Sequence, residues 1–124
     1  MQSTPRKLNT LQMAVLIRVL RGFADQQVNL CYYPPAEDAL GFAEDFLTVF
    51  KAIGWNVKEA APLEVANGQW TGLAFVVSEE GSLPPSAEAL RDTLRIYGIE
   101  VATFCDPACN TQAGGFILAI GPPA

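Results

Sequence analysis

The clearest pattern of apolar and polar residues along the chain lies between residues 28 and 58. An apolar run over 28–33, ended by two prolines, is typical of a buried strand. The next segment, 37–53, has helical spacing, since its apolar side chains fall on one helical face: Ala39, Phe42, Ala43, Phe46, Leu47, Phe50 and Ile53. Gly54 ends this helix, and a second strand is expected over 55–58. The pattern predicts a strand–helix–strand unit with parallel strands and a right-handed crossover.

A helix is also expected over residues 10–21, after a capping box formed by Asn9 and Gln12. It is apolar almost all round, and only Gln12, Arg18 and Arg21 interrupt it. Such a helix requires burial on more than one side. Either it packs deep against the sheet, or one of its sides meets a second subunit or a segment outside this chain.

Three more strands and one more helix complete the pattern. Residues 73–77 are apolar on both faces, as in a covered parallel strand. Two prolines then open a helix that ends at Gly98. Strands are expected over 99–104 and 116–120. The loop between them is too short for a helix, so the last strand should run antiparallel to its predecessor.

These elements predict an α/β fold: a three-layer sandwich with a five-stranded, mostly parallel sheet, the last strand antiparallel, and helices on both faces. The last strand is expected at an edge, in the strand order 55–58, 28–33, 73–77, 99–104, 116–120. At 124 residues, half of them hydrophobic, the chain has the size and composition of one globular domain. We expect residues 1–8 to be a disordered tail and residues 9–124 to form that domain.

Composition argues against several classes of function. The net charge of −5 argues against binding of nucleic acid, whose phosphates require a basic face. The absence of histidine removes the commonest general base and the commonest metal ligand. No apolar run has the length of a membrane-spanning helix, and no segment has the features of a signal peptide. Because the cysteines have no framework spacing, we expect a reduced, cytoplasmic location, and we expect no cofactor.

A ligand site in an open α/β sheet lies beyond the carboxyl ends of the parallel strands, near the change in strand order. In the predicted topology three loops meet there, over residues 32–38, 78–82 and 105–110. They supply a candidate rim of ligand-binding residues: Tyr32, Tyr33, Glu37, Asp38, Glu79, Glu80, Cys105 and Asp106. The five acids of this candidate rim either hold a divalent cation or serve as capping and solvent-facing acids. No catalytic residue is assigned.

The cysteines and the aromatic residues leave alternatives open. We expect two or three of the cysteines to be free thiols. The alternatives are that Cys105 and Cys109, four positions apart, bind a metal or form a bridge, or that Cys31 approaches Cys105. Aromatic side chains at strand ends and in loops either line an apolar pocket or fill the core: Tyr32, Tyr33, Trp55 and Trp70.

Segments spread over most of the chain carry a resemblance. They are 11–23, 23–28, the helix 38–53 with the Gly54-Trp55-Asn56-Val57 that follows it, 73–77, 90–99 and 117–122. In these segments the chain resembles an uncharacterised soluble domain found in bacteria, often attached to predicted membrane helices. Members of that type often carry a lysine between their final prolines, which Pro122-Pro123 lacks. The resemblance implies no known activity. It implies a membrane tether outside this chain, or a stand-alone relative.

No motif in the chain names a chemistry, so we expect a non-enzymatic binding or protein-interaction domain at the cytoplasmic face of a membrane, with another protein or a second copy as its partner. The alternative is a small ligand- or metal-binding enzyme domain that uses the candidate rim, with Glu79, Glu80 and Asp106 as metal-binding or acid/base groups. An interaction domain requires an exposed apolar patch. An enzyme requires a concave pocket with titratable groups.

Overall fold

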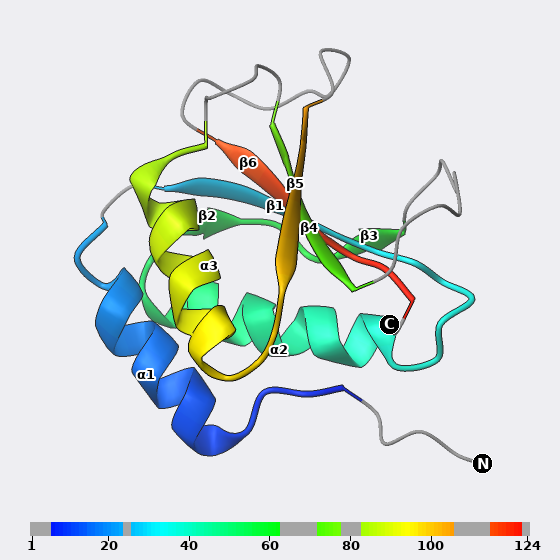
Figure 1. The fold of residues 1–124 in the computed structure, drawn as a ribbon, viewed down its shortest axis with the longest axis horizontal. Coiled ribbons are helices and arrows are strands. Elements are labelled where there is room, and N and C mark those ends of the chain that lie inside the picture. The colour runs from blue at the N-terminus through cyan, green and yellow to red at the C-terminus, as the bar shows by residue number, and fades with distance from the viewer. Residues whose placement is uncertain (1–5, 24–25, 63–71, 78–82, 106–114, 123–124) are drawn as a thin grey trace.

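The computed structural model of the chain describes residues 6–23, 26–62, 72–77, 83–105 and 115–122 (Figure 1). Within these residues the helices are α1 (Thr10–Leu20), α2 (Ala39–Ala52) and α3 (Pro85–Ile96). The strands are β1 (Gln27–Tyr32), β2 (Asn56–Val57), β3 (Ala61–Pro62), β4 (Leu73–Val77), β5 (Val101–Cys105) and β6 (Phe116–Ile120). The strands form one mixed sheet, so the predicted α/β fold class is confirmed.

Local signals in the sequence explain where the helices begin and end. The N–H of Gln12 donates to the Asn9 side chain at 2.7 Å, and the N–H of Asn9 donates to the Gln12 side chain at 3.0 Å. This capping box satisfies donors that the first turn of α1 leaves unpaired. Gly54 and Gly98 follow α2 and α3 with φ of 77° each, the left-handed conformation that glycine adopts without strain.

The strand order is β2-β1-β6-β4-β5, with β3 also paired to β1. The last strand therefore lies in the centre of the sheet, and the predicted edge position was wrong. It runs parallel to β1 and antiparallel to β4, so the prediction of an antiparallel last strand is confirmed. The burial of this strand agrees with its central position, because four of its five residues are buried and a neighbouring strand lies on each side of it.

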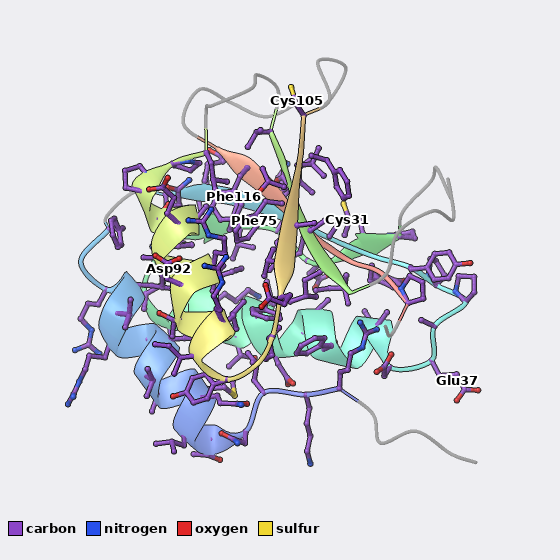
Figure 2. The ribbon with its side chains drawn as sticks, viewed as in Figure 1. Cys31, Glu37, Phe75, Asp92, Cys105 and Phe116 are labelled. Carbon is purple, nitrogen blue, oxygen red and sulfur yellow. The ribbon has the colours of Figure 1, made fainter. Side chains whose placement is uncertain are left out.

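The three helices lie on one face of the sheet rather than on both (Figure 1). Across the sheet, Leu30 pairs with Leu118, which pairs with Phe75, so these side chains share a face. They belong to one hydrophobic core together with buried side chains of all three helices. Figure 2 shows Phe75 and Phe116 on the side where α3 lies, and Cys31 on the other side.

The central position of β6 is the physical reason for this arrangement. A right-handed crossover places its helix on a face set by the strand direction and by the side to which the chain steps. The units β1-α2-β2 and β4-α3-β5 step toward opposite edges of the sheet. Because β6 is parallel to β1 and antiparallel to β4, the strands of the two units also run in opposite directions. The two reversals cancel, and both helices cover the same face.

A row of aromatic rings joins α2 to the sheet. Ring centroids are 5.0 Å apart for Phe50 and Trp55, 6.4 Å for Trp55 and Phe116, and 5.2 Å for Phe75 and Phe116. Trp55 is 4% exposed, and its Nε1–H donates to the carbonyl of Phe23 at 2.8 Å. Trp55 therefore fills the core and does not line a pocket, while Trp70 lies outside the described residues.

The segment before α1 is held in place as far back as Arg6, so the expected tail over residues 1–8 is too long. Leu8 is buried, and its N–H donates to the Asp45 carboxylate at 2.9 Å. The Arg6 side chain binds Asp38. Residues 1–5 lie outside the described residues.

Candidate functional site

The candidate rim does not form a single site, because two of its described residues, Tyr32 and Cys105, lie at opposite ends of the sheet. Tyr32 pairs with Ile120, which pairs with Leu73, the first residue of β4. Cys105 pairs with Val77, the last residue of β4. The carboxyl ends of β1 and β5 therefore point in opposite directions, and the rim was predicted on the assumption that they meet.

The candidate-rim residues of the first loop lie in one segment of the chain. Tyr33, Glu37 and Asp38 follow Tyr32 in the connection from β1 to α2, and Figure 2 shows Glu37 far from Cys105. Glu37 is exposed, whereas Asp38 is half-buried. Glu79, Glu80 and Asp106 lie outside the described residues. In the part of the chain that is described, no three acids or cysteines gather as a metal site would require.

The proposed approach of Cys31 to Cys105 is also not found. Cys31 lies on β1 and Cys105 on β5, with β6 and β4 between them. Three strand spacings are about 14 Å, well beyond the reach of a disulfide. The pairing registers also place the two side chains on opposite faces of the sheet. Burial raises the pKa of the Cys31 thiol, which makes it a poor nucleophile. Cys109 lies outside the described residues.

The strongest polar cluster in the described residues is centred on Arg6, which pattern reasoning assigned to the tail. Its Nε–H and Nη2–H donate to the two carboxylate oxygens of Asp38 at 2.9 Å each, and its backbone N–H donates to the same group at 2.8 Å. Nη2 also donates to the carbonyl of Gly121 at 2.7 Å. The guanidinium lies 5.4 Å from the ring centroid of Phe42. Among the described residues, its buried Nη1 has no hydrogen-bond partner.

These contacts define what Asp38 can do chemically. Hydrogen bonds from Arg6 lower the pKa of Asp38 to about 2, so the carboxylate is ionised throughout the physiological range. A group held in this state serves to position Arg6, not to exchange protons as a general acid or base.

A cavity of about 590 Å³ opens beside this cluster. Its wall combines the segment before α1, the first turns of α1 and α2, the start of β4 and the connection from α3 to β5. The residues of most chemical interest in it are Arg6, Lys7, Phe42, Leu73, Tyr97 and Glu100. None of the six was predicted as a site residue, because the segments that bring them together are distant in sequence and carry no motif.

The second surface feature is the outward face of α1. Leu16 and Leu20 are fully buried, whereas Leu11 is 67% exposed and Val19 is 37% exposed. We call the outward apolar side chains the α1 stripe: Leu11, Ala14, Val15 and Val19. One side of this helix packs against α2 and α3, and the α1 stripe is left at the surface. That a second subunit or another segment covers the stripe stays a prediction.

Comparison of the chain with protein-family models, with curated proteins and with solved structures finds no match. The fold and these two surface features therefore carry the functional argument. Within the described ranges, no helix combines the length and apolar character needed to cross a bilayer.

Proposed function

We propose that the chain is a non-enzymatic protein-interaction domain that pairs with a second copy of itself through the α1 stripe. The observation that carries this proposal is the exposure of the stripe, with 67% of Leu11 accessible on a helix that also anchors the core. Contiguous exposed apolar side chains mark interaction surfaces in soluble proteins.

The spacing of the α1 stripe favours a second copy as the partner. A two-fold interface requires a surface that is complementary to itself. If two α1 helices pair antiparallel about Val15, Leu11 lies opposite Val19 of the second copy. Arg18, the only charged residue within α1, then lies opposite Gln12, so no like charges face each other at the centre.

Other features support a non-enzymatic role at a membrane. The chain has no histidine, and Asp38 is engaged by Arg6. The resemblance to bacterial domains attached to membrane helices supports a cytoplasmic domain that brings two membrane proteins together. The alternative, a ligand- or metal-binding enzyme domain that uses Glu79, Glu80 and Asp106, stays a prediction because these three acids lie outside the described residues.

Light scattering after gel filtration, from micromolar to near-millimolar concentration, tests the proposal. We expect the particle mass to rise from the monomer value of 13.3 kDa to twice that value. Leu11→Glu should keep the chain monomeric, because it places a carboxylate in the apolar contact. The matched control is Leu40→Glu, which changes a leucine on α2 that is 41% exposed and should leave the dimer intact. A monomer at every concentration, or equal effects of the two variants, would overturn the proposal.

A further inference from the structure

We propose that the cavity beside Arg6 binds a free α-amino acid with an apolar side chain. This inference concerns a different surface from the α1 stripe and does not depend on dimer formation. It is carried by three properties of the cavity wall: helix ends of opposite polarity (two N-terminal and one C-terminal), charged side chains of both signs, and apolar residues at its base.

Helix ends of opposite sign meet at the cavity. Gln12 and Phe42, in the first turns of α1 and α2, lie in its wall, and so do Tyr97 and Gly98, which end α3. Backbone groups at a helix N-terminus favour a negative charge, and those at a C-terminus favour a positive charge. The cavity is therefore suited to a ligand that carries both charges.

The charged side chains in the cavity wall also carry both signs. On the positive side, Lys7 is exposed without an ion pair among the described residues, and the Arg6 guanidinium, which is paired with Asp38, lies beside it in the wall. A ligand carboxylate can accept a charged hydrogen bond from the Lys7 ammonium. Glu100 forms an exposed ion pair of 3.9 Å with Arg95, and its carboxylate can also accept a hydrogen bond from a ligand ammonium group.

The apolar residues at the base of the cavity favour an apolar side chain on the ligand. Phe42, Leu73 and Ile99 contribute apolar surface, and about 590 Å³ lies within the range of small-molecule sites, about 300–1,000 Å³. A doubly charged phosphate would meet Glu100 and the negative end of α3. A purely apolar ligand would leave the Lys7 ammonium without a partner in the cavity. An amino acid with an apolar side chain matches the helix ends, the charged side chains and the apolar base of the cavity.

Calorimetric titration of the whole chain with L-leucine and L-phenylalanine tests the assignment. We expect saturable binding of at least one of them, with a dissociation constant of about 1 mM or lower. Two truncated analogues of leucine, 4-methylpentanoate without the ammonium and 3-methylbutylamine without the carboxylate, should each bind about tenfold more weakly or worse.

Variants connect the binding to the cavity. Lys7→Gln and Glu100→Gln change exposed side chains, so they should fold normally, and each should weaken binding about tenfold. Lys58→Gln and Glu59→Gln, exposed and away from the cavity, are the matched controls and should bind as the parent chain does. Leu11→Glu, monomeric by expectation, should also bind normally, which separates this proposal from the dimer. No heat with either amino acid at high millimolar concentration, or equal binding of the truncated analogues, would overturn it.

Discussion

Arg6 and Asp38, 32 positions apart in the chain, are joined by two parallel hydrogen bonds of 2.9 Å between guanidinium and carboxylate. The same guanidinium donates to the carbonyl of Gly121, 115 positions away. One side chain thus ties the segment before α1 to the start of α2 and to the end of β6. The position of the cavity wall therefore depends on this pair.

Replacing Arg6 by glutamine should lower the free energy of unfolding by about 1–3 kcal/mol, because charged hydrogen bonds at a largely buried site are lost. Urea denaturation at neutral pH measures the change. The control is Arg91→Gln, whose partner Asp92 lies 3.4 Å away with 63% of its side chain exposed, and it should change stability by less than about 0.5 kcal/mol. Equal losses in the two variants would contradict a special role for Arg6.

The ion pair of Arg6 and Asp38 should make the free energy of unfolding depend on pH. Arg6 lowers the pKa of Asp38 from 3.8 to about 2 in the folded chain. A carboxyl group with a lowered pKa contributes stability above its unfolded pKa and loses that contribution as the pH falls through its folded pKa. The contribution of Asp38 should therefore be complete above about pH 4 and should vanish as the pH falls to about 2.

Comparison with Asp38→Asn isolates this contribution. The parent chain should be the more stable of the two above pH 4, and the difference should shrink steadily between about pH 4 and pH 2. Urea denaturation at several pH values over this interval provides the measurement. A difference that stays constant down to pH 2 would show that the carboxylate charge of Asp38 does not contribute in this way.

Local patterns in the sequence predicted the elements of the fold well. The apolar spacing of α2, the capping box of Asn9 and Gln12, and the left-handed glycines Gly54 and Gly98 are all found where they were expected. Each depends on residues within one or two helical turns of each other, so the sequence pattern contains the relevant contacts.

Sequence patterns did not predict the site, because its geometry depends on pairing between strands that are distant in the sequence. Strand β6 is apolar on both faces, a pattern that suits any covered strand, and its insertion between β1 and β4 reverses the direction of β4 and β5. That single reversal moves Cys105 away from Tyr32 and brings the helices to one face. Arg6 carries no periodic signal, and its partners lie far along the chain.

Packing around Phe116 should be sensitive to truncation of its side chain. Its side chain is 1% exposed and contacts Phe75 and Trp55 edge-on. Phe116→Ala should cost about 3–5 kcal/mol of unfolding free energy, because it removes buried contacts and leaves a cavity, and Phe116→Leu should cost markedly less. Ile96→Ala, at a site 80% exposed, should change stability by less than about 0.5 kcal/mol. Similar costs for Phe116→Ala and Ile96→Ala in urea denaturation would refute the assigned core.

One substitution made at two glycines of the α2 region should have opposite effects. Gly41 lies in the first turn of α2, has no atom within 4 Å of an added Cβ, and has no positive φ. Gly41→Ala should therefore stabilise the chain by about 0.5–1 kcal/mol, because alanine loses less backbone entropy in a helix.

Gly54, just after α2, also has space for a Cβ, but its φ is +77°. Gly54→Ala should cost about 1–2 kcal/mol, because a side chain is strained in the left-handed conformation. Since neither substitution creates a clash, the sign of each effect reports backbone conformation alone. Thermal and urea denaturation of the two variants measure both signs in one experiment. Stabilisation by Gly54→Ala would mean that α2 does not end at this residue in the left-handed turn described above.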